Sequence, residues 1–496
     1  MIAQAIQKVH FSAKDAVQPV VRELPADLET PVSTYLKLAN GGAQPSFLLE
    51  SVSGGEQVAR YSFIGVDPGR AFVLRGRTVE THTPEGAASR QVEDPLDALQ
   101  AELARRPVHS LPGLPRFAGG LAGYLSYEMM RFFEPSVALR PHDDLPDAIF
   151  LLADTLVAFD HAFGRLLLIA TPDPALGEEP GRAAAEAQLD ALQARLAGPL
   201  PARASAHPAA LASAEMQANL TREQFTRAVV AAKEHIAAGD IFQVVLSQRL
   251  SRETAADPFD IYRALRRLNP SPYMFYFNFA NLAGGEPLRL IGASPEMHVR
   301  LEGRAATIRP IAGTRPRGKS PADDLALEAE LLADPKERAE HVMLVDLARN
   351  DLGRVCEYGT VRVPELMGVE RYSHVMHIVS QVEGRLRPDL DAFDLMRATF
   401  PAGTVSGAPK IRAMQIIDEL EGQPRGPYAG AVGYFAADGS MDTCIAIRTL
   451  AMRGKQISVQ AGAGIVADSE PETEYQETLN KARALAQAVE MAEKGL

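Results

Sequence analysis

The feature that most constrains the fold of this chain is a run of strand-like segments joined by very short turns. The segment GYFAADGSMDTCIAIRTLAMRGKQISVQAGAGIV, at 433–466, predicts three strands that turn at Asp438-Gly439 and at Arg453-Gly454. Two-residue turns join antiparallel strands, whereas parallel strands need a crossover of a dozen or more residues. The segment therefore predicts an antiparallel sheet rather than the parallel sheet of a nucleotide-binding fold.

Other parts of the chain carry the same pattern. The segment MHVRLEGRAATIRPI reads as a hairpin that turns at Glu302 and Gly303. Strand-like runs broken by short turn signals also fill the N-terminal part, at 60–66, 71–82 and 148–170. Hairpins therefore dominate the chain, which places it in the α+β class.

Helices and one linker complete this organisation. A helix is predicted between an N-cap at Thr221 and a stop at Gly239. A second, C-terminal helix carries an apolar face made of Leu479, Ala482, Ala486 and Val489. The Pro-, Ala- and Ser-rich stretch 198–215 is typical of a linker. The sequence thus predicts an N-terminal region, 1–215, and a C-terminal region, 216–496.

Composition excludes several function classes. The 496 residues carry a net charge of −12, which argues against a nucleic-acid-binding protein. No apolar run approaches the roughly 18 residues of a membrane span, and the N-terminus lacks the layout of a signal peptide, so we expect a cytoplasmic protein that does not enter the membrane. With only Cys356 and Cys444, a disulfide framework and a four-cysteine zinc site are excluded.

The stretch GTRPRGKS, at 313–320, matches the P-loop template letter for letter. An ATPase is therefore one hypothesis. Pro316, however, removes a backbone donor from the phosphate nest, and Asp323 and Asp324 follow at the start of the next predicted helix, where a phosphate would otherwise bind. Downstream, EHVMLVDLARNDL suits an amphipathic helix rather than a strand. The surroundings thus oppose a triphosphate site.

Nine segments taken together resemble one family. They are DIFQVVLSQR, GASPE, PIAGTRPRG, AEHVMLVDLARNDLGR, YSHVMHIVS, FPAGTVSGAPK, PYAGAVGY, CIAIRT and QAGAGIVADSEPETEYQETLNKA. In this order they resemble the chorismate-utilising enzymes, and within them the large subunits of anthranilate synthases, from about residue 220 to the C-terminus. The resemblance implies two large antiparallel sheets packed together with flanking helices. It also implies an enzyme that converts chorismate and ammonia to anthranilate and pyruvate in tryptophan biosynthesis.

The resemblance implies a Mg²⁺ site and a pocket for a dicarboxylate. Its metal ligands are Glu340 and Glu477, in keeping with the usual binding of Mg²⁺ by one or two carboxylates. For the substrate carboxylates we expect Arg448, on a strand, to offer its planar fork and Tyr428 its hydroxyl. Further lining comes from backbone amides and polar side chains, namely Gly313, Thr314, Thr404, Gly462, Ala463, Gly464 and Lys481. Taken singly, each glutamate would be read as a solvated side chain, Arg448 as part of a cross-strand ion pair, and the glycines as ordinary turn or bulge residues.

The proton chemistry is assigned in the same way. Glu296 of GASPE matches the general acid, which must be protonated when the ring hydroxyl leaves and so should lie where burial raises its pKa. His377 is the candidate for assisting the elimination step, although a lone histidine is more often structural.

Two positions distinguish this chain from its relatives. Gln243 stands where water-adding relatives carry a lysine base, which favours ammonia as the nucleophile. Ala312 stands where 4-amino-4-deoxychorismate-forming relatives carry a nucleophilic lysine, and alanine cannot act as a nucleophile. An aminodeoxychorismate synthase subunit nevertheless remains an alternative, as does a regulatory subunit without activity.

The resemblance also implies two further ligands. Neither cysteine has the setting of a glutaminase nucleophile, so ammonia is expected from a separate glutamine amidotransferase subunit. L-Tryptophan is expected as a feedback inhibitor, bound by the element FLLES and the stretch NPSPYMFYF. Its contacts are carried over as Ser51, Pro272, Tyr273 and Met274. Plain core packing is the alternative for the aromatic stretch.

Overall fold

Two antiparallel sheets form the centre of the computed structural model, which describes residues 16–52, 60–109, 113–142, 144–201, 215–372 and 375–496. Sheet I runs in the order β1 (Val20–Pro25), β10 (Arg165–Ala170), β9 (Thr155–Asp160), β3 (Tyr61–Val66), β2 (Ser46–Glu50), β13 (Tyr273–Asn278), β14 (Leu288–Ser294), β23 (Thr449–Arg453), β24 (Gln456–Ile465), β12 (Gln243–Glu253) and β11 (Gln217–Ala218), with β20 (Gly407–Ala408) also paired to β12. The predicted antiparallel α+β class is confirmed.

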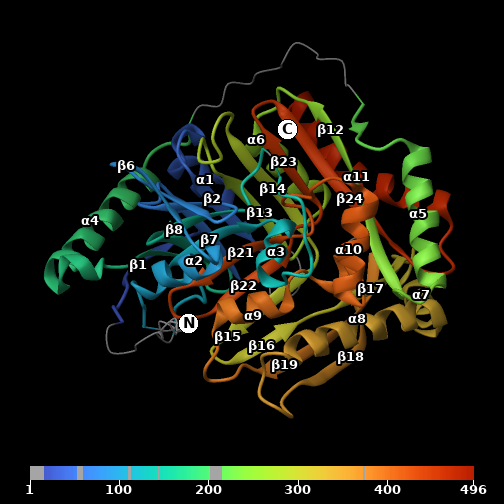
Figure 1. Cartoon of the computed structure of the whole chain (residues 1–496). Helices are drawn as coiled ribbons and strands as arrows, with labels where there is room; N and C mark the ends of the chain where they lie inside the picture. Colours follow the sequence, from blue (N-terminus) through green and yellow to red (C-terminus); the bar gives the residue numbers. More distant parts are fainter. Residues whose placement is uncertain (1–15, 53–59, 110–112, 143, 202–214, 373–374) are drawn as a thin grey trace.

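Sheet II is built in the same way. It runs in the order β17 (Ile311–Pro316), β19 (Val375–Arg385), β16 (Ala305–Ile308), β15 (Met297–Glu302), β22 (Met441–Ile445), β21 (Ala431–Ala436), β7 (Gly120–Leu125), β8 (Ala148–Ala153), β4 (Ala71–Arg75), β5 (Thr78–Thr83) and β6 (Gly86–Gln91), with β18 (Arg362–Arg371) also paired to β19. In both sheets, strands from before and after residue 215 lie side by side: blue β2 pairs with yellow-green β13 in sheet I, and teal β7 pairs with orange-red β21 in sheet II (Figure 1). The two regions predicted from the sequence therefore share their sheets.

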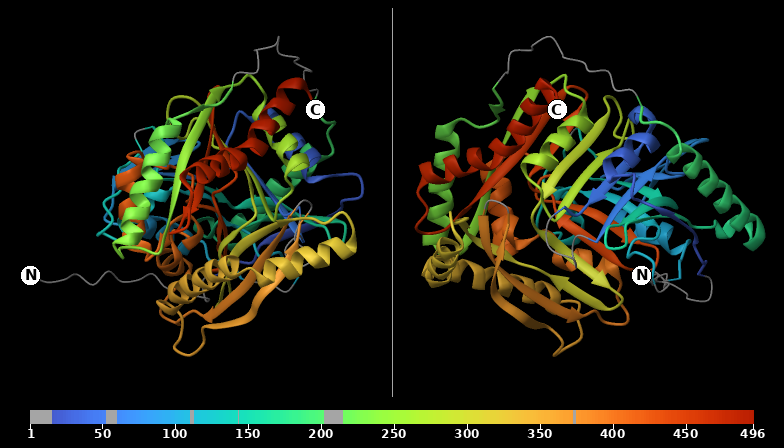
Figure 2. Two further views of the ribbon diagram at one scale, coloured as in Figure 1. Left: turned by 90° about the vertical axis from the view of Figure 1, so that its right-hand side faces the viewer. Right: turned by 180° about the vertical axis from the view of Figure 1, so that it is seen from behind.

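Helices cover the outer faces of the sheets. They are α1 (Pro31–Leu38), α2 (Pro95–Ala104), α3 (Met130–Phe133), α4 (Glu178–Leu196), α5 (Arg222–Ala237), α6 (Pro258–Leu268), α7 (Pro321–Ala333), α8 (Pro335–Gly353), α9 (Ala392–Thr399), α10 (Lys410–Glu421) and α11 (Pro471–Lys494). Helix α8 lies along the strands of sheet II, whereas α5 and α11 lie together against sheet I (Figure 2). Within the described ranges, no helix is both long enough and apolar enough to cross a membrane.

Local chemistry explains the helix ends. Thr221 caps α5 in a capping box with Gln224, as predicted, and Gly239 follows the helix with a φ of +84°. Asp334 caps α8, and Pro335 occupies its first turn, so the segment around EHVMLVDLARNDL is a helix, as predicted. Residues 202–214 of the predicted linker lie outside the described residues.

A core of aromatic and aliphatic side chains fills the space between the sheets. Sheet I contributes Phe47, Phe275 and Phe277, and sheet II contributes Tyr124 and Tyr434. Separate clusters lie under the helices on the outer faces. Because burying each large aromatic side chain stabilises the fold by about 1.5–3 kcal/mol, this shared interior holds the two sheets together.

One prediction about the strands was wrong. The segment 433–466 contributes to four strands, β21 to β24, and not to three. Strands β21 and β22 pair in sheet II, whereas β23 and β24 pair in sheet I. The chain crosses between the sheets at Ala446–Arg448, a stretch without glycine or proline that gave no turn signal.

Candidate active site

Two crossings between the sheets meet at the candidate site. The chain passes from β14 to β15 through Glu296, and from β22 to β23 through Arg448. The crossings are joined by backbone hydrogen bonds: the Ile445 amide donates to the Glu296 carbonyl, and the Ala293 amide donates to the Arg448 carbonyl, both at 3.1 Å. An acid and a cation far apart in the sequence are thus held on one rigid junction.

Arg448 does not lie within a strand, contrary to the expectation from the sequence. It lies in the crossing itself, with a φ of +50°, in the left-handed region that is uncommon for residues other than glycine. Its Nη1 makes a long contact of 3.5 Å with the Lys481 carbonyl oxygen. Burial lowers the pKa of Arg448, while the charges of Glu296 and Glu477 oppose that shift. The guanidinium is therefore a desolvated cation beside two carboxylates.

Glu296 lies in the environment that a general acid needs. Burial raises the pKa of its carboxyl above the ordinary value, and the Thr404 hydroxyl, Lys481 and Arg448 reduce that rise. Thr404 lies in the short turn η4 (Gly403–Val405), and its hydroxyl oxygen is buried without a hydrogen bond of good geometry among the described residues. A cavity of about 380 Å³ contacts both Glu296 and Thr404. The acid therefore has a polar neighbour and room beside it.

Strand β24 and helix α11 form the opposite wall. Lys481 Nζ donates to the Gly462 carbonyl at 2.9 Å and forms an ion pair with Glu477 at 2.6 Å. Arg448, Glu477 and Lys481 line a shallow hollow on this side. Gly462, Ala463 and Gly464 follow one another on β24. The predicted run AGAG is thus joined to this hollow through Lys481.

Tyr428 packs against this strand. A Cβ atom at Gly462 would meet the Tyr428 hydroxyl at 2.6 Å and the Leu246 carbonyl oxygen at 2.9 Å. Glycine is therefore required for the tyrosine to lie so close to the strand. Burial raises the pKa of Tyr428, so its hydroxyl remains a hydrogen-bond donor.

Gln243 and Glu340 meet across two elements. Gln243 begins β12, and its Nε2 donates to Glu340 Oε1, on α8, at 3.2 Å. Burial raises the pKa of Glu340, and the charges of Glu337 and Glu477 raise it further. Gly464 borders the pair, because a Cβ there would lie 2.7 Å from Gln243 Nε2.

These donors fit one type of metal. Glu340 and Glu477 repel each other electrostatically, and a divalent cation would relieve that repulsion. No group of three or more histidine, cysteine, aspartate or glutamate side chains suited to a metal occurs in the part of the chain that the structure describes. Two carboxylates suit Mg²⁺, which keeps waters and substrate oxygens as its other ligands, better than an all-protein zinc or calcium cage.

Gly313, Thr314 and His377 form a third wall. His377 on β19 lies opposite Thr314 on β17. Its Nδ1 is 3.1 Å from both the Gly313 carbonyl oxygen and the Thr314 hydroxyl. Because a carbonyl oxygen only accepts, Nδ1 carries the hydrogen and Nε2 has the lone pair. Burial lowers the pKa of His377, and nearby Arg448 lowers it further, which favours the neutral, basic form.

The P-loop match lies in a different context. Gly313 is inside strand β17, which pairs antiparallel with β19, rather than after a parallel strand. The Gly318 amide donates to Asp324 at 2.6 Å, and Arg317 bonds the same carboxylate. The amide and the arginine that would face a phosphate are therefore used within the protein.

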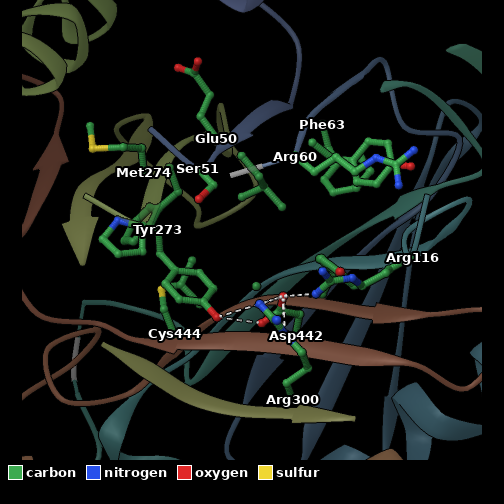
Figure 3. A pocket seen from close by; sticks show the side chains of 17 residues that line it. Glu50, Ser51, Arg60, Phe63, Arg116, Tyr273, Met274, Arg300, Asp442 and Cys444 are labelled. Carbon is green, nitrogen blue, oxygen red and sulfur yellow. Dashed lines mark hydrogen bonds and ion pairs between the residues drawn. The ribbon is translucent and has the colours of Figure 1, made fainter. Parts of the chain in front are cut away.

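A second cavity, of about 650 Å³, lies between the sheets away from this site (Figure 3). All four residues predicted to contact an effector line it, namely Ser51, Pro272, Tyr273 and Met274. The alternative of core packing also has some basis, since Met274 is 1% exposed and Phe275 belongs to the core between the sheets. The Ser51 hydroxyl oxygen is buried and has no hydrogen-bond partner within the described ranges.

Residues that sequence reasoning missed complete this cavity. Arg116, Arg300, Asp442 and Cys444 also line it. Asp442 accepts from Tyr273 Oη and from Arg300 Nε, both at 3.0 Å. Asp442 and Cys444 lie in a strand that was recognised from the sequence. Nothing local in the sequence, however, indicated that this strand would lie opposite β13 of the other sheet.

Comparison with known proteins agrees with this geometry. Residues 44–487 match the family model described as chorismate binding enzyme. The chain is 49% identical to anthranilate synthase component 1 of Pseudomonas putida over 483 residues, which covers 96% of each chain. The crystal structure of anthranilate synthase component I from Streptococcus pneumoniae superposes with a TM-score of 0.75 at 39% identity, covering 86% of this chain and 92% of that one.

A more distant structure supports the fold alone. The menaquinone-specific isochorismate synthase of Escherichia coli superposes with a TM-score of 0.70 at 22% identity, over 96% of this chain and 95% of that one. From the family match and the half-identical relative, the chain belongs to the chorismate-binding enzymes, in the group that contains component 1 of anthranilate synthase.

Proposed function

We propose that this chain converts chorismate and ammonia to anthranilate, pyruvate and water. The observation that carries the proposal is the junction at which backbone hydrogen bonds join the crossing that carries Glu296 to the crossing that carries Arg448. The charge of Glu477 acts on Arg448 and on Glu340. An acid with a raised pKa, a desolvated cation and two carboxylates that could hold a divalent cation suit a dicarboxylate that must lose a hydroxyl group.

Substrate binding is assigned to the wall formed by β24, α11 and the second crossing. Arg448 would form a bidentate pair with one substrate carboxylate, and the Tyr428 hydroxyl would donate to it. The glycines of β24 allow the backbone amides to approach the ligand. Lys481, held by the Gly462 carbonyl, adds a second cation at this end.

The first half of the reaction needs an acid. Glu296 would protonate the leaving hydroxyl, which departs as water, while ammonia adds at C2 of the ring. The raised pKa of Glu296 favours its protonated form, and the Thr404 hydroxyl is placed to hold the carboxyl.

The second half needs a base. His377 Nε2, unprotonated in the tautomer described above, would take the proton from C2 as the bond to the enolpyruvyl oxygen breaks. The enolpyruvyl group takes up one proton to become pyruvate, and the ring becomes aromatic.

Glu340 and Glu477 would hold Mg²⁺. When bound, this ion would neutralise charge on a substrate carboxylate and fix its orientation. The amide of Gln243 restrains Glu340 in the position that this role requires.

The choice of nucleophile follows from two side chains. Gln243 is occupied by Glu340 and has no basic nitrogen with which to activate water. Ala312 lies beside Gly313 on β17, where an alanine cannot attack the ring. Both observations favour ammonia over the nucleophiles of the sister activities.

L-Tryptophan is proposed as an inhibitor that binds the second cavity. The cavity combines apolar walls with the buried Ser51 hydroxyl, which has no hydrogen-bond partner among the described residues. Its wall is covalently continuous with the active site: Cys444 precedes Ile445, whose amide bonds the Glu296 carbonyl. An occupant that shifts β22 would therefore move the catalytic acid.

The name component 1 of the relatives implies a partner component. We propose a glutamine amidotransferase subunit that supplies ammonia, because Cys356 and Cys444 are buried and burial raises the pKa of both thiols, unlike an activated nucleophile. A cytoplasmic location suits a biosynthetic enzyme of this kind.

The test is anthranilate fluorescence from the purified chain with chorismate, Mg²⁺ and ammonium, repeated with EDTA and with L-tryptophan. We expect fluorescence that requires the metal and that tryptophan suppresses. If isochorismate or aminodeoxychorismate forms in place of anthranilate, the chain catalyses a related reaction of the same family instead. No consumption of chorismate by folded protein would overturn the catalytic proposal.

A further inference from the structure

One buried arginine outside the catalytic residues links several of them. Arg425 follows α10, and its side chain is 1% exposed. Its Nη1 donates to the Val405 carbonyl at 2.8 Å, next to Thr404, and its Nη2 donates to the Val245 carbonyl at 2.7 Å, two residues from Gln243. One guanidinium therefore ties the turn that carries Thr404 to the strand that carries Gln243.

The charge of Arg425 is balanced within the protein. Glu421 accepts from Nε at 2.9 Å and from Nη2 at 2.6 Å. The same carboxylate accepts from the Ser247 amide and hydroxyl at 2.8 and 2.9 Å. Because the pair is satisfied on every side, the guanidinium has one geometry rather than several.

The planar face of the Arg425 guanidinium contacts two aromatic rings. The carbon at its centre lies 4.6 Å from the ring centroid of Tyr127 and 5.5 Å from that of Tyr428. Tyr428 is the residue whose hydroxyl lies close to Gly462 on strand β24. The cation also lowers the pKa of the Tyr428 hydroxyl, against the larger raising effect of burial. Arg425 therefore acts on this tyrosine through both packing and charge.

The N-terminal region reaches the same residue. Glu128, in the short turn η2 (Tyr127–Met129), accepts from the Arg425 amide at 2.6 Å and from the Gly426 amide at 3.0 Å. Tyr127, which stacks on the guanidinium, comes from the same turn. The loop that leads into Tyr428 is thus held from both sides.

We propose that Arg425 is a positioning residue for the substrate pocket, which sets the place of the Tyr428 ring relative to Thr404 and to strand β12. The assignment rests on the proposed function of Tyr428 in binding chorismate. Arginine is required because its planar fork serves two carbonyls and a carboxylate while its face contacts a ring, and lysine supplies only a point charge. An error of about 1 Å in such a site lowers turnover by as much as about 100-fold.

The test compares Arg425→Lys with a matched control, Arg252→Lys. Arg252 lies at the far end of β12, the strand that Arg425 contacts through Val245; its side chain is 6% exposed, and it is paired with Glu493 at 3.0 Å. We expect Arg425→Lys to raise the KM for chorismate by roughly 5- to 50-fold, with the KM for ammonium unchanged. Arg252→Lys should leave both values unchanged.

A double-mutant cycle identifies the route. Arg425→Lys is measured again in the Tyr428→Phe background, where its effect on the chorismate KM should be at least about threefold smaller if Arg425 acts through the tyrosine hydroxyl. A merely structural role would lower kcat in proportion to the folded fraction, with an unchanged KM and additive effects. An unchanged chorismate KM in Arg425→Lys, or additive effects of the two substitutions, would overturn the positioning role.

Two safeguards keep the outcome decisive. If Arg425→Lys does not fold, Glu421→Gln, which keeps the shape of the pair but removes the compensating charge, is measured for the same rise in KM. If the unmodified chain makes no anthranilate, the proposed function fails. If it makes anthranilate and both variants retain its KM, only the positioning role fails.

Discussion

Gln243 Nε2 donates a 3.2 Å hydrogen bond to Glu340 Oε1 across 97 residues of sequence. The amide therefore fixes one oxygen of the carboxylate that is proposed to bind Mg²⁺, while the charge of Glu477 acts on the same group. A pair of carboxylates held in this way stores electrostatic repulsion that a bound cation removes. Loss of either carboxylate should thus be visible both in turnover and in metal-dependent stability.

Glu340→Gln and Glu477→Gln should each lower anthranilate formation by at least about 100-fold. Mutating a residue that only hydrogen-bonds to a metal ligand already lowers metal affinity or activity by about 10- to 100-fold, and a direct ligand matters more. The rise in Tm on addition of Mg²⁺ should also disappear. Glu472→Gln, on the same helix as Glu477 and paired with Arg222 at the surface, is the control. A normal Mg²⁺ response in both variants would contradict this site.

The proposed role of Glu296 sets a pH dependence. Burial raises the pKa of this carboxyl, and a general acid works only while it holds its proton. The rate expressed per free ammonia should therefore fall as the pH rises through that raised pKa. Since free ammonia itself increases with pH, the rate must be normalised before the profile is interpreted.

Glu296→Gln should lower kcat by roughly 10²- to 10⁴-fold and remove this alkaline limb. Glu302→Gln, at the exposed end of the following strand, should retain both. An unchanged profile in Glu296→Gln would assign the acid to another group.

The sequence predicts the pairing of strands better than their distribution between sheets. The hairpin of β21 and β22 follows from Asp438 and Gly439, because turn chemistry is local. Nothing local marks the crossing at Arg448, since apolar residues precede it and its left-handed backbone is imposed by the two sheets it joins. Short apolar runs therefore predict a strand but not the sheet it enters.

The candidate site follows the same division. Glu296, His377 and Glu340 were predicted because each lies in a block that resembles a family, and their roles stay predictions. Arg425 was missed, because its partner Val245 lies 180 residues away and a single arginine beside a proline and a glycine has no distinctive pattern. Long-range contacts of this kind become visible only in the folded chain.

Ser51→Ala should weaken inhibition by tryptophan. The hydroxyl oxygen is buried at the edge of the second cavity and has no hydrogen-bond partner within the described residues, so an occupant can supply one. Loss of a hydrogen bond of about 1–2 kcal/mol corresponds to a roughly 5- to 30-fold rise in the tryptophan concentration for half inhibition. Ser89→Ala, on the exposed strand β6, should have no effect. Equal inhibition of both variants would exclude this contact.

His298 should make the protein less stable in mild acid. It is 3% exposed, and burial lowers its pKa to about 4 from 6.5. Below pH 6.5 the unfolded chain binds a proton that the folded chain excludes, so this stability is complete above pH 6.5 and is lost as the pH falls toward 4. The loss amounts to about 2 kcal/mol between pH 7 and pH 5.

Urea unfolding at several pH values measures this effect. His298→Asn should show a shallower fall in the free energy of unfolding below pH 6.5, whatever its stability at pH 7. Ser89→Ala, on the exposed strand β6, removes no titratable group and is the control, which should keep the slope of the parent chain. The same slope in His298→Asn would attribute the acid sensitivity to other groups.

Gly462→Ala tests the fit between strand and tyrosine. The added Cβ would lie 2.6 Å from the Tyr428 hydroxyl and 2.9 Å from the Leu246 carbonyl oxygen, and the second of these belongs to the backbone and cannot move cheaply. We expect a stability loss of about 1–3 kcal/mol and a rise in the chorismate KM of roughly 10- to 100-fold, because the tyrosine is displaced. The control is Gly353→Ala at the end of α8, where the new Cβ meets nothing within 4 Å. This variant should keep the KM of the parent chain and should not be less stable than it. If Gly462→Ala folds and keeps the KM of the parent chain, the Tyr428 hydroxyl does not contact the substrate.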